Sequence, residues 1–323
     1  MKKTLRTSGL TLLGLSISFF TGLANAAIPS ELKLDYAYYA PTSLVVKEQK
    51  LLEKALPKTK IKWVFSQGSN RSLEYLNSGS TDFASTAGLA AVLSRANGSP
   101  IKTVYIQSQP EWTALVVNKD SNIKSLKDLK GKKIAATKGT DPFLFTLQAL
   151  DTIGLGKRDV ELVHLQHPDG KTALERKQVD AWAGLDPLMA SAQAQSGAKL
   201  LYRNVSFNSY SVLSVKDQFA KSSPEAIEAV IKAYEQARKW AKANPDKLAE
   251  LLAREAKLPI EVAKLQLSRT NLDQNIPTTK HTGALQKAGR ILTEEELVRK
   301  GTNVNQVVTQ LFDARYAKKV VTK

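Results

Sequence analysis

Short segments with strand character alternate with helical segments along most of the chain, and this alternation constrains the fold most strongly. Apolar residues at every second position predict a strand over 32–38, and apolar residues at helical spacing predict a helix over 43–56. Equivalent strands are expected at 61–65, 82–84, 103–108, 113–117, 133–136, 161–165, 181–184, 199–202 and 210–215, and helices at 69–77, 88–95, 142–153, 170–177 and 187–196. The pattern predicts an α/β fold of two parallel-sheet units, followed from residue 222 by mostly helical chain.

Small polar residues follow four of the predicted strands, at the point where a helix begins. These runs are Ser66-Gln67-Gly68-Ser69-Asn70, Ser85-Thr86-Ala87-Gly88, Thr137-Lys138-Gly139-Thr140-Asp141 and Leu185-Asp186-Pro187. The carboxyl ends of parallel strands meet at one edge of a sheet, and the free amides and positive dipole ends of helix starts favour an anion. A single run is ordinary helix capping. Four runs in two successive units favour an anion site in a cleft.

The chain is strongly basic, with 47 Lys and Arg against 30 Asp and Glu and a formal charge of +17. The basic residues are interleaved with acids, as in the segment 235–239, which is typical of solvated helix faces. A nucleic-acid-binding protein gathers its charge in a patch and adds a reading module. Nucleic acid is therefore not expected as a partner. The net positive charge is expected to create a weak, distributed electrostatic potential that attracts anionic ligands.

Residues 1–26 have the pattern of a secretory signal peptide. Lys2, Lys3 and Arg6 precede the uncharged apolar stretch 9–20, and 24–26 reads Ala-Asn-Ala, a small-x-small cleavage site. Export to the periplasm is expected. Removal of these three cations lowers the charge from +17 to +14.

Residues suited to catalysis or metal binding are scarce. The chain has no cysteine and three histidines, His164, His167 and His281. His164 and His167 have HxxH spacing without an evident third ligand. No cofactor, metal or catalytic residue is expected.

Four ordered motifs resemble the substrate-binding proteins of ABC importers for aliphatic sulfonates, taurine and nitrate, along nearly the whole mature chain. The motifs lie at 36–41, 76–86, 126–135 and 179–187. The resemblance implies a type II periplasmic binding protein, with two α/β lobes joined by a two-strand hinge and a ligand cleft between them. It implies a discontinuous first lobe of residues 27–113 plus 209–323 and a second lobe of residues 114–208.

The same resemblance implies the ligand-binding residues. Gln67, Ser85, Thr86 and Thr140 are expected to meet the anionic head. The cleft is expected to be lined by Tyr39, Trp112, Trp182 and Asp186. From the residues alone each aromatic is somewhat more consistent with ordinary core than with a pocket wall. Asp186 is equally consistent with a helix cap and with an acceptor for a ligand amine.

The expected function is capture of a small organic anion, first of all an aliphatic sulfonate, by a monomer that delivers it to an inner-membrane ABC permease and ATPase. The alternative is a protein of the same fold that binds taurine, nitrate or a thiamine pyrimidine precursor. A pyrimidine-synthase-like enzyme is less expected, because that family carries a cysteine-rich motif and this chain has no cysteine. A sensor or interaction role stays open.

Overall fold

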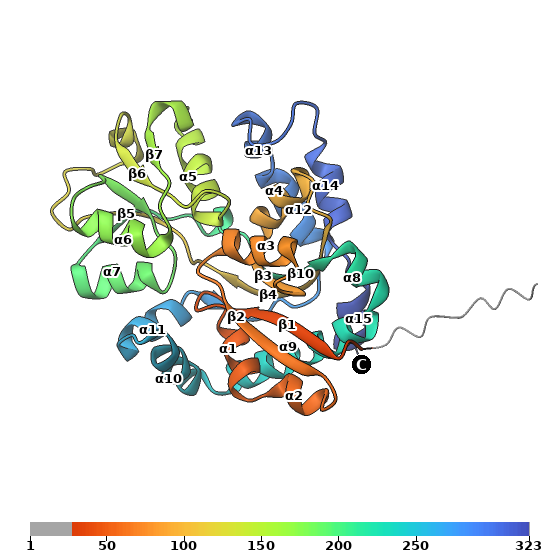
Figure 1. Ribbon diagram of the computed structural model, residues 1–323. Helices are drawn as coiled ribbons and strands as arrows, with labels where there is room; N and C mark the ends of the chain where they lie inside the picture. Colours follow the sequence, from red (N-terminus) through yellow and green to blue (C-terminus); the bar gives the residue numbers. More distant parts are fainter. Residues whose placement is uncertain (1–27, 323) are drawn as a thin grey trace, which may run out of the picture.

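Two β-sheets, each covered by helices, form two lobes in a computed structural model that describes residues 28–322 (Figure 1). The first sheet has the strand order β11-β4-β10-β3-β1-β2 and the second has the order β7-β6-β8-β5-β9. The first sheet contains β1 (Glu31–Tyr36), β2 (Lys60–Phe65), β3 (Phe83–Ala87), β4 (Ile101–Pro110), β10 (Ser211–Lys216) and β11 (Thr270–Asn271). The second contains β5 (Leu115–Val117), β6 (Lys133–Ala135), β7 (Glu161–Val163), β8 (Ala181–Ala183) and β9 (Lys199–Tyr202).

Both sheets are mixed, whereas the sequence pattern predicts parallel ones. Strand β1 is parallel to β2 and β3, as expected, but β10 is antiparallel to β3 and β4. In the second sheet β6 is parallel to β7 and β8, and β5 is antiparallel to β8 and β9. The exceptions are β5 and β10, which lie at the crossings between the sheets, and the two-residue edge strand β11, which is antiparallel to β4. No crossover helix precedes β5 or β10, so nothing forces either strand into the parallel direction.

Helices flank both sheets. The first lobe contains α1 (Pro41–Glu48), α2 (Leu51–Ala55), α3 (Ser69–Ser78), α4 (Gly88–Ala96), α8 (Asp217–Ser222), α9 (Pro224–Ala243), α10 (Pro245–Ala256), α11 (Ile260–Leu267), α12 (Thr279–Ala288), α13 (Arg290–Glu294), α14 (Val304–Leu311) and α15 (Arg315–Val321). The second contains α5 (Asp141–Asp151), α6 (His167–Glu175), α7 (Leu188–Ser196) and the 3₁₀ turns η1 (Leu126–Leu129), η2 (Lys157–Asp159) and η3 (Val205–Phe207). The single helix expected at 43–56 is broken, because Lys50 has the left-handed φ of 50°.

The hydrophobic core explains why the long C-terminal helices belong to the first lobe. The predicted apolar face of α9 is confirmed, since Ile227, Val230, Ile231 and Tyr234 are fully buried against the first sheet, with α1 and α10 beside them. On the other side, one cluster continues from α3 and α4 through Trp112 into α5 of the second lobe. The lobes therefore share buried apolar surface near the crossings.

The chain crosses between the lobes twice. Residues 111–114 lead from β4 to β5, and residues 203–210 lead from β9 back to β10. The Asn208 side chain joins the crossings, because its Oδ1 accepts from the Thr113 amide at 2.8 Å and its Nδ2 donates to the Thr113 carbonyl at 3.3 Å. The expected lobe boundaries near 113 and 208 stay a prediction, and the expected signal peptide lies outside the described residues.

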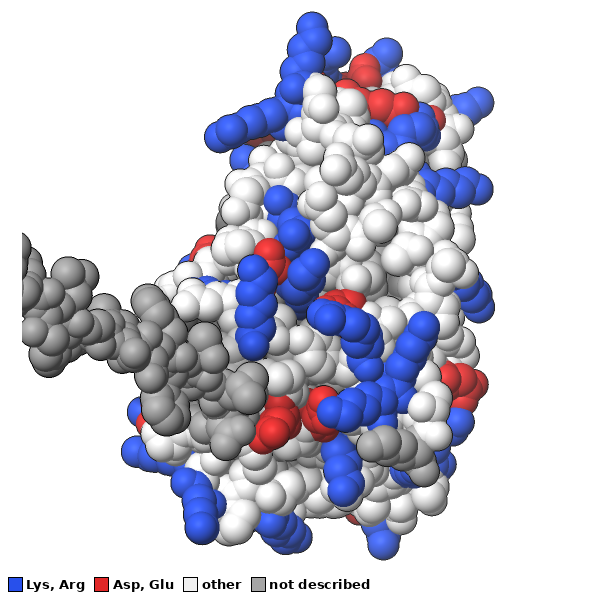
Figure 2. All heavy atoms as spheres, turned by 90° about the vertical axis from the view of Figure 1, so that its right-hand side faces the viewer, with Lys and Arg blue, Asp and Glu red and all other residues white. Residues whose placement is uncertain are grey.

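Basic side chains are dispersed over the face that carries α8 and α15, with acidic residues between them (Figure 2). Several form ion pairs, such as Lys319 with Glu228 at 2.7 Å and Arg315 with Asp313 at 2.7 Å. This arrangement agrees with solvated helix faces rather than one binding patch. Within residues 28–322, no helix combines the length and the apolar character needed to cross a membrane.

Candidate ligand-binding site

Helix starts from the two lobes face each other across the cleft. The loop before α3 contains Gly68, where a Cβ atom would lie 2.8 Å from Nε2 of His167, the first residue of α6. Beside this contact, Nδ2 of Asn70 donates to Oε1 of Gln166 over 3.4 Å. The carboxyl-end loops of the first and second sheets therefore meet, as an inter-lobe site requires.

A cavity of about 250 Å³ lies between the lobes next to this contact. The first lobe contributes Tyr38, Tyr39, Phe65, Ser66, Gln67, Ala256 and Leu258, and the second contributes Pro168, Leu185, Asp186, Pro187 and Leu188. The walls are mainly aromatic and aliphatic, with few polar groups. Such a composition suits an organic ligand that is oriented by a small number of polar contacts.

Asp186 is the buried charged group of this cavity. Its Oδ1 accepts from the Ala190 amide at 2.9 Å, and its Oδ2 lies 3.6 Å from Nε of Arg269. Burial raises the pKa of Asp186 to about 7, and the Arg269 guanidinium opposes that rise. Its charge in the closed cleft thus depends on its cationic neighbour.

Asp35, near the end of β1, accepts hydrogen bonds from three other segments of the first lobe. Its Oδ2 accepts from the hydroxyls of Ser66 at 2.9 Å and Ser72 at 2.5 Å, and its Oδ1 accepts from the Ser85 amide at 2.7 Å. Burial raises the pKa of Asp35 to about 6, although these hydrogen bonds favour the ionised form. One carboxylate therefore fixes the loop after β2, the start of α3 and the end of β3.

Ser85 and Thr86 carry hydroxyls that are buried at the carboxyl end of β3. Both residues are 0% exposed, and neither hydroxyl has a hydrogen-bond partner among residues 28–322. The Ser85 carbonyl accepts from the hydroxyl of Tyr39 at 2.9 Å, which places Ser85 directly behind a cavity residue. Buried hydroxyls are costly unless a ligand or ordered water completes their bonding.

The structure brings three of the eight expected site residues to the cavity, namely Tyr39, Gln67 and Asp186. Ser85 stands behind it, since its carbonyl accepts from Tyr39, and Thr86 is the next residue of β3. Thr140 is buried at the start of α5, where its Oγ1 donates to the Thr137 carbonyl at 2.6 Å. Their roles in ligand binding stay predictions.

The two expected tryptophans do not line this cavity. Trp182 is 1% exposed within the core of the second lobe, so close to α6 that a Cβ at Gly170 would lie 2.8 Å from its ring. Trp112 lies at the first crossing, with its ring edge-on to Tyr39 at a centroid distance of 5.8 Å. Strand β8 points alternate side chains to opposite faces, which sends Trp182 toward α6.

His167 lies at the contact between the lobes, whereas the sequence pattern drew attention to it only through its HxxH spacing from His164. Thr137 Oγ1 donates to the Leu165 carbonyl at 2.7 Å, so Nδ1 of His167, 3.2 Å from the same oxygen, acts as the donor to it. The ring nitrogen Nε2 is then an acceptor, and burial lowers the pKa of His167 to about 3. Among residues 28–322 no group of three or more metal-ligating side chains is present.

The family model described as NMT1/THI5 like matches residues 60–248 of this chain. Among curated proteins, one from Escherichia coli (strain K12), provisionally named aliphatic sulfonates-binding protein, is 29% identical over 299 residues, which are 92% of this chain and 93% of that protein.

Two solved structures are also similar. The alkanesulfonate-binding protein SsuA from Xanthomonas axonopodis pv. citri, bound to MOPS, has a TM-score of 0.81 at 25% identity over 87% of this chain and 98% of that chain. The periplasmic aliphatic sulphonate binding protein SsuA from Escherichia coli has a TM-score of 0.75 at 28% identity over 86% of this chain and 92% of that chain. These matches confirm the expected periplasmic-binding-protein fold, and all three proteins are named as binding proteins.

Proposed function

Because the chain belongs to the NMT1/THI5-like family, we propose that it is the periplasmic substrate-binding protein of an ABC importer. Its proposed ligand is a small organic anion, first of all an aliphatic sulfonate. The observation that carries the proposal is the inter-lobe cavity of about 250 Å³, whose walls are mainly aromatic and aliphatic. An inorganic anion such as nitrate or sulfate has no tail for such walls, whereas an alkanesulfonate does.

The sulfonate head is proposed to bind neutral donors. Its three oxygens accept hydrogen bonds, and a buried anion needs these donors in place. Ser85 and Thr86 offer buried hydroxyls at the carboxyl end of β3, and Gln67 offers a side-chain amide at the cavity. Thr140 is proposed to act from the second lobe, at the start of α5.

Closure of the lobes is the proposed mechanism of capture. The first lobe, residues 27–113 plus 209–323, and the second, residues 114–208, are proposed to move as rigid bodies about the two crossings. The cavity takes its walls from both lobes, so the full set of contacts exists only when they meet. Ligand then shifts the equilibrium toward the closed form, which the permease and its ATPase are proposed to recognise in a monomeric carrier.

A thermal-shift and calorimetry panel tests the ligand class. The panel contains butanesulfonate, octanesulfonate, taurine, nitrate, sulfate, bicarbonate and an uncharged thiamine pyrimidine precursor. We expect the alkanesulfonates to raise the melting temperature, because ligand that binds only the folded chain stabilises it by RT ln(1 + [L]/Kd). A shift with nitrate or with the uncharged precursor alone would overturn the sulfonate assignment, and a shift with taurine alone would favour Asp186 as an amine acceptor.

A pair of matched variants tests the anion site. Thr86→Val removes a buried hydroxyl without a partner from the carboxyl end of β3, and Thr81→Val removes one from the loop before the strand's amino end. We expect about tenfold weaker butanesulfonate binding for Thr86→Val and unchanged affinity for Thr81→Val. Equal affinities would remove Thr86 from the site.

Recovery of the bound compound distinguishes binding from catalysis. A carrier returns its ligand chemically unchanged, whereas a pyrimidine-synthase-like enzyme returns a product. Mass spectrometry of the compound released after prolonged incubation is expected to show the starting sulfonate alone. Conversion of the sulfonate into another compound would contradict the carrier role.

A further inference from the structure

The segment 258–271, which contains α11 and β11, is attached to the first lobe but lies against the second. Strand β11 pairs with β4, with Thr270 opposite Pro110, and the Glu111 amide donates to the Arg269 carbonyl at 2.8 Å. Helix α11 nevertheless packs against α7 of the second lobe, beneath which it lies in Figure 1. The segment therefore bridges the cleft outside the two crossings.

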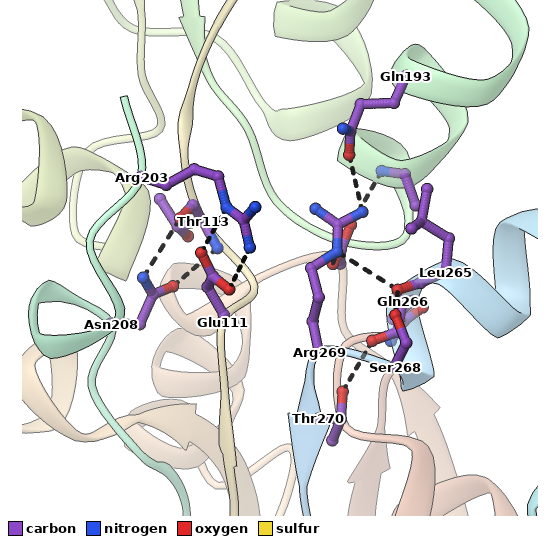
Figure 3. Close-up of polar contacts among 12 residues, drawn as sticks. Glu111, Thr113, Gln193, Arg203, Asn208, Leu265, Gln266, Ser268, Arg269 and Thr270 are labelled. Atoms are coloured by element: carbon purple, nitrogen blue, oxygen red, sulfur yellow. Dashed lines mark hydrogen bonds and ion pairs between the residues drawn. The ribbon is translucent and has the colours of Figure 1, made fainter. Parts of the chain in front are cut away.

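The Arg269 side chain makes the polar contacts of this bridge (Figure 3). Its Nη2 donates to Oε1 of Gln193 on α7 at 2.8 Å, and its Nε lies 3.6 Å from Oδ2 of Asp186. The side chains of Arg269 and Asp186 are only 8% and 1% exposed. A charge pair this deeply buried is poorly screened, and loss of one partner leaves an uncompensated charge.

The same segment forms part of the cavity wall. Leu258 lines the cavity, and Nε2 of Gln266 donates to the carbonyl of Tyr38, another lining residue, at 2.7 Å. Arg269, Gln266 and Leu258 therefore connect the closed cleft to one continuous stretch of chain.

A second ion pair joins the crossings and provides a comparison. Arg203 donates to Glu111 through Nε at 2.8 Å and Nη2 at 2.7 Å. The Arg203 side chain is 54% exposed, so solvent screens this pair. Figure 3 shows it beside the Arg269 contacts.

We propose that Arg269 is a positioning residue for lobe closure, which holds the second lobe through Asp186 and Gln193 and balances the Asp186 charge so that the cavity accepts an anion. Both parts rest on the lobe closure proposed above, and the charge-balancing part rests also on the proposed anionic ligand. Opening of the cleft would separate Arg269 from both partners, because its backbone is fixed to the first crossing.

Spin-label distance measurements test closure directly. The chain has no cysteine, so Lys127→Cys in the second lobe and Lys232→Cys in the first, both at exposed positions, provide unique attachment points. Distance distributions are recorded without ligand and with butanesulfonate, in the labelled parent and in the variants Arg269→Gln, Arg269→Lys, Arg203→Gln and Asp186→Asn combined with Arg269→Gln.

We expect Arg269→Gln to lower the closed-to-open ratio about tenfold or more, and Arg203→Gln to change that ratio little. Arg269→Lys keeps a positive charge and is expected to give a ratio between those of the parent and Arg269→Gln. The double variant is expected to close better than Arg269→Gln, because it has no uncompensated carboxylate. Equal effects of Arg269→Gln and Arg203→Gln, or no closed population in the parent under either condition, would overturn the proposal. If Arg269 controls closure but butanesulfonate has no effect, the closure role stands and the proposed ligand is wrong.

Discussion

The indole Nε1–H of Trp112 donates to carboxylate Oδ2 of Asp141 at 2.9 Å, which ties the first crossing to α5 of the second lobe. The same carboxylate accepts from the Ser209 amide at 2.8 Å and from the Ser209 hydroxyl at 2.7 Å. Asp141 thus joins both crossings at one buried point, and burial raises its pKa. This junction lies beside Tyr39, which contacts Trp112 edge-on.

Trp112→Phe tests the importance of this junction. The change keeps an aromatic ring against Tyr39 and removes one donor from a buried carboxylate, so we expect a loss of about 1–3 kcal/mol in the free energy of unfolding. Urea unfolding measures the loss. Trp63→Phe is the control, since the Trp63 indole bonds to Glu53 at 3.3 Å in a partly buried position. Similar losses in the two variants would contradict a special role for the Asp141 junction.

Expected site residues that reach the cavity include two whose polar runs directly follow predicted strands. Gln67 follows β2 of the first sheet and Asp186 follows β8 of the second, and both residues line the cavity between the two sheets. Asp35 leaves no such signal, because it alternates with the apolar residues of β1 as Glu31 and Lys33 do, and its partners come from three separate segments. The sequence pattern does not distinguish it from an ordinary polar residue of a strand.

The contacts of Arg269 and the orientation of Trp182 could not be predicted from the sequence. Nothing near Arg269 distinguishes it from other helix-end cations, because Asp186 lies 83 positions away and the contact exists only through the packing of α11 on α7. An aromatic residue in a strand has the same local signal whether it faces core or cleft. Trp182 faces the core because Gly170 leaves room for its ring under α6.

Asp35 variants separate the effect of its charge from that of its hydrogen bonds. Asp35→Ala leaves the Ser85 amide and two serine hydroxyls without their acceptor, and we expect it to lower the free energy of unfolding by about 3 kcal/mol. Asp35→Asn retains an acceptor for the Ser85 amide and lets the hydroxyls reverse, so a loss within about 1 kcal/mol is expected. Urea unfolding of both variants measures this, and equal losses would show that the charge itself is required.

We expect the burial of neutral His167 to lower the free energy of unfolding as the pH falls. The unfolded chain takes up a proton on His167 near the ordinary pKa of 6.5, whereas burial keeps the folded side chain neutral to about pH 3. Between these values the unfolded state binds the extra proton, so stability falls by about 1.4 kcal/mol for each pH unit of acidification. Asp35 and Asp186 act in the opposite direction, because their raised pKa values, about 6 and 7, favour the protonated folded chain as pH falls.

A variant comparison isolates the histidine from these carboxyl groups. Urea unfolding of the parent and of His167→Gln at pH 7.5, 6.5, 5.5 and 4.5 is expected to show the parent losing stability relative to the variant below pH 6.5. His164→Gln, at an exposed position, is the control and should follow the parent. Parallel curves for parent and His167→Gln would mean that His167 titrates normally in the folded protein.

Gly68→Ala is expected to weaken ligand binding by obstructing closure rather than by damaging the first lobe. The φ of Gly68 is 178°, an extended conformation that alanine adopts, so the backbone tolerates the change. The new Cβ would lie 2.8 Å from Nε2 of His167, which belongs to the other lobe, and that clash exists only while the lobes touch. Within the first lobe its nearest neighbour is Oδ1 of Asn70 at 3.1 Å, the end of a side chain that can turn away. We expect about tenfold weaker butanesulfonate binding by calorimetry, because the variant shifts the equilibrium toward the open form.

Gly283→Ala is the control, since a Cβ there meets nothing within 4 Å, and it should bind butanesulfonate like the parent. Unchanged affinity in Gly68→Ala would show that the ligand-bound protein does not bring Gly68 and His167 together.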